Sequence, residues 1–115
     1  MTMSKDRLNI GDMPSEYLAI YNVIYNAQAP ITREKILLYL AKDKSYERRF
    51  NEIINKMIVD YGLPIGSSSR EGYRGYYVVT NKEELNIAVQ SLKSRINRIS
   101  ERKEALEQII KDMED

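Results

Sequence analysis

Apolar residues recur at spacings of three and four in three stretches of the first sixty residues, which is the period of helices with one buried face. The first helix is expected from Asp12, as its cap, to about Tyr25. Thr32 begins a second helix that runs to about Leu40, and Ser45 caps a third. The third helix has a regular buried stripe, made of Tyr46, Phe50, Ile53, Ile54, Met57 and Ile58.

The pattern changes after Gly62, which supplies the left-handed residue that ends a helix. A short strand at 64–67 and a strongly β-prone run at 76–79 are separated by a polar tip, in which Gly72 and Gly75 allow unusual backbone dihedrals. Three helices followed by a β-hairpin predict an α+β fold of the winged helix-turn-helix type.

The last third of the chain, 81–115, predicts one long helix that opens with a capping box from Thr80 to Glu83. Its apolar residues follow a seven-residue repeat, typical of a coiled coil, with β-branched residues at most a positions and leucine at most d positions, which favours two parallel strands. Lys103 occupies one a position. At about 1.5 Å per residue the helix is too long for so small a domain to cover, so we expect a homodimer. The predicted dimer seam consists of Leu85, Val89, Leu92, Ile96, Ile99, Leu106, Ile110 and Met113.

The net charge of the chain counts against a nucleic-acid partner. The chain carries 18 Lys and Arg against 17 Asp and Glu, a net charge of +1, far from the excess typical of electrostatic DNA binders. The segment 42–74 has seven basic and five acidic residues, whereas 81–115 has seven basic and eight acidic. A phosphate-binding surface therefore needs a few cations gathered on one face.

The absence of cysteine and histidine limits the metal sites and catalytic groups that the chain is able to form. The chain has no cysteine and no histidine, which removes the usual zinc, haem and iron–sulfur ligands and the common catalytic triads. We expect no cofactor and no enzyme activity, since carboxylate pairs such as Glu83 and Glu84 suit the start of a helix. The sequence has no apolar run of membrane-spanning length and no apolar signal-peptide core, so a cytoplasmic protein without a membrane partner is expected.

The exposed face of the third helix carries the residue types that read DNA. Arginine pairs with guanine and asparagine with adenine, so Arg48, Asn51 and Asn55 are candidate base readers. Lys44, Ser45 and Arg49, near the start of the helix, are candidate phosphate ligands. The alternative is an ordinary solvated face, which any amphipathic helix shows.

The hairpin tip is the second candidate, because Arg70 and Arg74 lie among serines and glycines and are able to hold the DNA backbone or enter a minor groove. Serines and glycines are also what a turn requires. A third candidate is a basic band on the last helix, more easily explained as charged flanks of a coiled coil. The band consists of Lys93, Arg95, Arg98, Arg102 and Lys103.

The segment from about Pro30 to Ile99 resembles small winged helix-turn-helix proteins, of helix-turn-helix type 11-like character, encoded by phages and prophages of Gram-positive bacteria. The matching residues are Gly62–Ile65, Ser67, Ser68, Gly75–Tyr77, Glu83–Leu85 and Arg95–Ile99. This chain has a longer wing than the family pattern. The resemblance implies a DNA-binding regulator or an accessory replication factor.

These observations together predict a disordered segment at 1–11, a winged-helix domain at 12–80 and a dimerisation helix at 81–115. The expected function is binding of double-stranded DNA by a dimeric phage or prophage protein, as a transcriptional regulator or replication accessory factor. The alternative is a protein-interaction module that modulates or inhibits a host or phage protein, such as a replication factor or a defence nuclease. Near-zero net charge favours that alternative.

Overall fold

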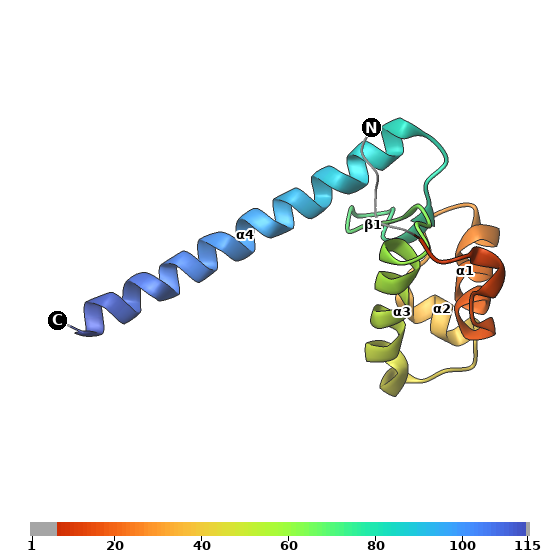
Figure 1. The fold of residues 1–115 in the computed structure, drawn as a ribbon, viewed down its shortest axis with the longest axis horizontal. Helices are drawn as coiled ribbons and strands as arrows, with labels where there is room; N and C mark the ends of the chain where they lie inside the picture. The colour runs from red at the N-terminus through yellow and green to blue at the C-terminus, as the bar shows by residue number, and fades with distance from the viewer. Residues whose placement is uncertain (1–6, 115) are drawn as a thin grey trace.

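The computed structural model describes residues 7–114, which form a head, residues 7–80, and an arm, the long C-terminal helix (Figure 1). Within these residues there are four α-helices and one two-stranded antiparallel sheet, so the predicted α+β class with a long C-terminal helix is confirmed. The elements are α1 (Ser15–Ala27), α2 (Arg33–Tyr39), α3 (Glu47–Val59), β1 (Ile65–Ser68), β2 (Gly75–Val78) and α4 (Lys82–Glu114), with single 3₁₀ turns at Ile10–Asp12 and Lys44–Tyr46.

The three helices of the head enclose one apolar core. The predicted stripes face inward except for Ile58, at the end of the α3 stripe, which is 40% exposed. Phe50 of α3 and Ile36 of α2 have no exposed surface at all. The other side chains with less than 2% exposure are Ile20, Ile24, Ile53 and Met57. Tyr76 of β2 closes the core from the sheet side, its ring meeting that of Phe50 edge to face at 5.3 Å between centroids.

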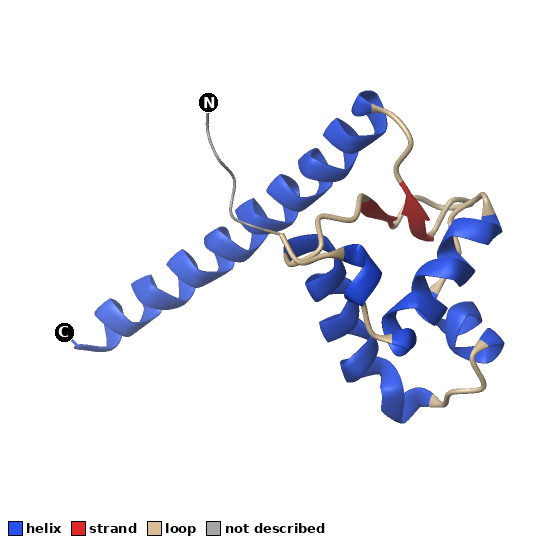
Figure 2. Ribbon diagram, turned by 45° about the vertical axis from the view of Figure 1, so that its right-hand side comes forward, coloured by secondary structure: helices blue, strands red, loops and turns tan. Residues whose placement is uncertain are grey.

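The hairpin joins the helices through one extra backbone pairing. β1 and β2 pair in the register Ile65↔Val78 to Ser68↔Gly75, and Ile31, between α1 and α2, exchanges two backbone hydrogen bonds with Tyr76 at 2.8 and 3.0 Å. Gly75 makes this approach possible. It has φ +125°, and a Cβ on it would lie 2.3 Å from the carbonyl group of Ile31. Figure 2 shows the two strands between the helices of the head and the start of α4.

Side-chain oxygens cap several helix starts as predicted, but the capping residue is not always the predicted one. The Thr32 hydroxyl accepts from the Lys35 N–H at 3.3 Å, which confirms that cap. The other two predicted caps are wrong. Asp12 belongs to the 3₁₀ turn capped by Asn9, and α1 begins at Ser15 without a side-chain cap. Asp43 performs the role predicted for Ser45, because an added 3₁₀ turn shifts the cap two residues earlier.

The capping box of α4 lies one residue later than predicted. Asn81 accepts from the Glu84 N–H at 2.8 Å, and the Glu84 carboxylate accepts from the Thr80 N–H at 2.9 Å and from its hydroxyl. The predicted pair, Thr80 and Glu83, is therefore wrong, since Asn81 supplies the side-chain oxygen in place of Thr80. Gly62, with φ +70°, ends the third helical segment as predicted.

The start of the described chain lies against α3. The Leu8 N–H donates to the Asp60 carbonyl at 2.8 Å, and Asn9 caps the following turn. Of the segment 1–11 predicted to be disordered, residues 1–6 lie outside the described residues. The folded part begins before residue 12.

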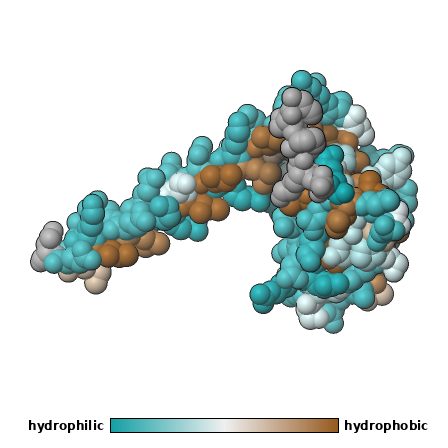
Figure 3. Space-filling model, viewed as in Figure 1, coloured by the Kyte–Doolittle hydropathy of each residue, from teal (hydrophilic) through white to brown (hydrophobic). Residues whose placement is uncertain are grey.

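The arm is one uninterrupted helix of 33 residues, about 50 Å long, and it leaves the head after its first turns (Figure 1). Its residues are nowhere fully buried, and apolar side chains run along it as a broken stripe (Figure 3). The eight residues predicted to form a dimer seam are exposed, by 42% (Val89) to 80% (Met113).

Candidate nucleic-acid interface

The fold places every predicted DNA contact on the surface. On α3, the buried stripe from Phe50 to Met57 fixes the rotation of the helix, so the opposite side is exposed. The eight predicted residues, Lys44, Ser45, Arg48, Arg49, Asn51, Asn55, Arg70 and Arg74, are all exposed. Exposure alone does not make them equivalent, because several are already engaged within the protein.

The start of α3 is organised by Asp43. Its carboxylate accepts from the Ser45 N–H at 3.0 Å and from the Ser45 hydroxyl at 2.5 Å, and these hydrogen bonds lower the pKa of Asp43. The Ser45 hydroxyl proton is therefore in use, and a carboxylate lies where a phosphate was expected. Lys44, next to it, is exposed and forms no ion pair among residues 7–114.

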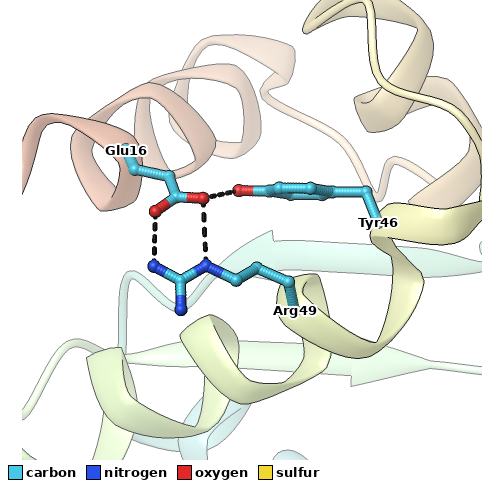
Figure 4. A network of polar contacts seen from close by, with 3 residues as sticks. All are labelled: Glu16, Tyr46 and Arg49. Atoms are coloured by element: carbon cyan, nitrogen blue, oxygen red, sulfur yellow. Dashed lines mark hydrogen bonds and ion pairs between the residues drawn. The ribbon is translucent and has the colours of Figure 1, made fainter.

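Arg49 is held by Glu16 of α1 (Figure 4). Two guanidinium nitrogens donate to the two carboxylate oxygens at 2.6 and 3.1 Å, and the Tyr46 hydroxyl donates to the same carboxylate. The Arg49 hydrogen bonds, with that of Tyr46, lower the pKa of Glu16 from 4.5 to about 2. Burial and the bond to Glu16 raise the pKa of Tyr46 to about 12. The cluster ties α3 to α1 and occupies one side of the Arg49 guanidinium.

Arg33, at the first residue of α2, approaches the opposite edge of α3. Its guanidinium lies 3.4 Å from the Glu47 carboxylate and donates to the Asn51 side-chain oxygen at 3.5 Å. The Nε of Arg33 is buried without a hydrogen-bond partner in the structure. Asn51 is thereby oriented with its oxygen toward α2, which leaves its NH₂ group available.

The first turns of α4 lie beside this edge and form a cleft of about 420 Å³ with α3 and β1. Asn51 and Asn55 of α3 line this cleft together with Leu92 and Arg95 of the arm, and Arg33 lines it as well. Burial raises the pKa of Tyr76 there, partly offset by the charges of Arg33 and Arg95. Two asparagines and two arginines therefore line one cleft, and Arg48 lies on the same face of α3 as the asparagines.

The sequence pattern does not single out Arg33, and it places Arg95 in a basic band that is more easily explained as a coiled-coil flank. The basic band on α4 was a signal for Arg95. The sequence offers no signal for Arg33, because its contact with Asn51 depends on the angle between α2 and α3.

The hairpin tip lies apart from this cleft. Arg70 lines a second, larger cleft of about 650 Å³, bounded by the end of α1 and the start of α4, with Tyr25, Tyr73 and Ile87 among its apolar walls. Arg70 and Arg74 form no ion pairs within the described residues. The structure thus does not bring the α3 and tip residues together in one site.

Residues 7–114 were also searched for metal-binding clusters and for membrane-spanning helices. They contain no group of three or more Asp and Glu placed to hold a metal ion, and none of their helices has a stretch both long and apolar enough to cross a bilayer. Comparison with protein-family models, with curated protein sequences and with solved structures yields no match for this chain. The case for a function depends on the geometry of the chain itself.

Proposed function

We propose that the head is a winged helix-turn-helix that binds duplex DNA with the exposed edge of α3. The order of elements is that of such a module, with the short pairing at Ile31 between α1 and α2 and the hairpin after α3. The observation that carries the proposal is that Asn51, Asn55, Arg33 and Arg95 line one cleft and that the exposed Arg48 lies on the same face of α3 as the asparagines.

The proposed contacts divide by chemistry. Arg48, Asn51 and Asn55 read base edges, where each good bidentate pair contributes about 1–3 kcal/mol of discrimination. Lys44, Arg70 and Arg74 contact the backbone, whereas Ser45 is left out because its hydroxyl and its N–H donate to Asp43. Arg49 contributes only the guanidinium N–H groups that Glu16 leaves open, so we expect it to be the weakest phosphate ligand of the set.

Arg95 joins the phosphate-contacting group in this proposal, and Arg33 adds only the N–H groups that Glu47 and Asn51 leave open. Both line the cleft next to the base-reading side chains, and the arm therefore flanks the duplex as well as α3 does. With the seam of α4 holding a second copy, the protein acts as a dimeric regulator of transcription or accessory factor of replication, of phage or prophage type.

A second candidate is a module that binds and modulates another protein. The net charge of +1 favours it, as do Leu38 and Tyr39, neighbours at the end of α2 whose side chains are 77% and 75% exposed. Apolar groups on an outer surface are typical of protein interfaces.

Titration of the full chain against fluorescent duplexes separates the candidates. The duplexes are a random sequence and one selected by the wild-type chain from a random library. Arg48→Ala should weaken binding to the selected duplex by roughly 1–3 kcal/mol, with less effect on the random one. Arg70→Ala should weaken both equally and reduce the salt slope by about one.

Lys111→Ala is the matched control, since it removes one positive charge near the far end of the arm. It should leave both affinities unchanged. If no duplex is bound at about 50 mM salt, the DNA proposal is wrong, and stable association with a host or phage protein would then favour the second candidate.

A further inference from the structure

The larger cleft, of about 650 Å³, lies between the end of α1, the hairpin and the start of α4. Its volume falls in the range of about 300–1,000 Å³ that is typical of small-molecule sites. Three tyrosine rings from separate parts of the fold line it: Tyr25 of α1, Tyr73 of the hairpin tip and Tyr77 of β2. Ile24 and Ile87 add aliphatic surface. These walls suit a ligand with a flat apolar ring.

Two of the three rings are held in place by contacts inside the protein. The Tyr25 ring stacks on that of Tyr21, one turn earlier in α1, with 6.1 Å between centroids and 22° between the ring planes. The Tyr77 ring lies over its cross-strand partner Gly66, where an added Cβ would come within 2.6 Å of the ring. Walls that are fixed before binding lose little conformational entropy when a ligand enters.

The charged groups of the cleft differ in how far the protein already uses them. The Arg70 guanidinium forms no ion pair among residues 7–114, and only the Arg70 backbone N–H is engaged, donating to the Ser68 hydroxyl at 3.2 Å. Glu84 is the only carboxylate among the described residues that line the cleft. It accepts from the N–H and the hydroxyl of Thr80 at 2.9 and 3.1 Å. The charge that is available to a ligand is therefore positive.

This difference distinguishes between the possible occupants. Tyrosine faces also attract cations, but the unpaired Arg70 repels a cationic ligand, and the Glu84 carboxylate that would neutralise one is engaged at the start of α4. A single-stranded nucleic acid needs several cations along its backbone, whereas Arg70 is the only cation among the described residues that line the cleft. One arginine matches the single charge of one carboxylate.

We propose that this cleft binds a small aromatic carboxylate. The ring of the ligand lies among Tyr25, Tyr73 and Tyr77, and its carboxylate accepts from the Arg70 guanidinium. The Ser68 hydroxyl accepts from the backbone, so its own proton is available to the same carboxylate. The ligand thereby joins the hairpin tip to the end of α1 and the start of α4.

A consequence for DNA binding follows from Arg70. This residue is also a proposed contact to the DNA backbone, and one guanidinium is not able to serve both partners fully. The ligand should therefore weaken binding to every duplex, which makes it an effector of the regulator. This consequence rests on the proposed function, whereas the site itself does not, because no DNA contact enters its geometry.

Three probes that share one ring system test the site on the full chain. They are naphthoate, the neutral naphthamide and the cationic naphthylmethyl-trimethylammonium, each titrated while amide chemical shifts are followed by two-dimensional NMR. Naphthoate should bind with a Kd of about 1 mM or lower, as expected for a probe of its size, and should shift amides of the cleft. The other two probes should bind at least about threefold more weakly, because neither pairs with a guanidinium.

Arg70→Ala should weaken naphthoate binding by about three- to tenfold and leave naphthamide binding unchanged. Arg74→Ala is the matched control, since it removes a second exposed arginine of the same tip that does not line the cleft. It should bind naphthoate as the wild type does. Tyr73→Ala should weaken both probes, because the ring contributes apolar surface to each.

Several results would overturn the inference: no naphthoate binding up to about 5 mM, equal binding of the three probes, tighter binding of the ammonium, or an unchanged naphthoate affinity in Arg70→Ala. Displacement of naphthoate by a lower concentration of a short oligothymidylate would overturn it as well, in favour of a nucleic-acid strand.

The duplex titration is read separately. Saturating naphthoate should weaken binding to the random duplex about as much as Arg70→Ala does, and should have no further effect on that variant. If no duplex is bound, the proposed function fails while the NMR titration still decides the site. If the duplex is bound and naphthoate does not weaken it, the effector role is wrong.

Discussion

The head and the arm have the same helical pattern of apolar residues, but these residues are buried in the head and exposed in the arm. In the head, the stripes of α1, α2 and α3 close on one another, and six large side chains are less than 2% exposed. In the arm, a longer and more regular stripe stays uncovered, with ten large apolar side chains exposed by 42% to 80%. An amphipathic pattern therefore specifies a helix, but what covers its apolar face depends on whether the chain turns back.

The difference follows from helix length. α2 has 7 residues and α1 and α3 have 13 each, so each helix of the head is short enough for its neighbours to cover. α4, at 33 residues, extends beyond any surface that the head offers. The core of the head is buried within one chain, whereas the apolar stripe of the arm stays exposed in the single chain.

The largest expected effect tests this contrast directly. Phe50→Ala should lower the free energy of unfolding by about 3–5 kcal/mol, because it leaves a cavity in a side-chain layer that cannot collapse. Leu106→Ala, its counterpart on the arm, should change unfolding of the head by less than about 0.5 kcal/mol and act instead on dimer affinity. Urea denaturation followed by circular dichroism at several protein concentrations measures both. A concentration-independent loss of several kcal/mol in Leu106→Ala would contradict a free arm.

The next effect concerns how the hairpin closes the head. Gly75→Ala should cost about 2–4 kcal/mol, because φ is +125° and the new Cβ would lie 2.3 Å from the Ile31 carbonyl group. Gly72→Ala, also at positive φ but in open space, should cost only about 1–2 kcal/mol. Hydrogen exchange should show faster exchange of the Ile31 and Tyr76 amides in the first variant and not in the second. Equal effects would mean that the Ile31 pairing contributes nothing to closure.

The smallest effect concerns the polar tie between α1 and α3. The pKa of Glu16 is lowered from 4.5 to about 2, so its ion pair stabilises the head above pH 4.5 and that contribution is lost as the pH falls toward 2. Because the Glu16 and Arg49 side chains are 36% and 52% exposed, solvent screening keeps the contribution small.

Glu16→Gln should therefore flatten the decrease in stability between pH 4.5 and 2, measured by thermal unfolding across that range. Glu34→Gln, which removes an exposed carboxylate of α2 without an ion pair among residues 7–114, should leave the pH profile as in the wild type. An unchanged profile in Glu16→Gln would show that the tie seen in Figure 4 does not contribute to stability.

Much of the fold was predictable because its signals are local. The period of three and four gave the helices, and Gly62, Thr32 and the β-prone run at 76–79 marked their ends and the hairpin. Two side-chain caps, for the turn leading into α3 and for α4, were misplaced by one or two residues, since Asp, Asn, Ser and Thr all cap well and several lie next to one another. For α1, the predicted side-chain cap does not exist.

The candidate interface was predictable only as a set of residue types. The amphipathic stripe of α3 was enough to place Arg48, Asn51 and Asn55 on its surface. It gave no indication that Glu16, thirty-three positions away in the chain, holds Arg49. The stripe also gave no indication that Arg33 and Arg95 line the same cleft as Asn51.

The sequence by itself determined where this chain is helical, which side of each helix is apolar, and that the arm carries a seven-residue repeat with a basic half and an acidic half. These properties follow from residue spacing or from counting charges along the chain, so they can be predicted without knowing which residues are in contact. The tertiary structure decided which cations are engaged and which remain available, and that the arm flanks α3. Those outcomes depend on the angles between elements, which are set by packing of residues far apart in the sequence.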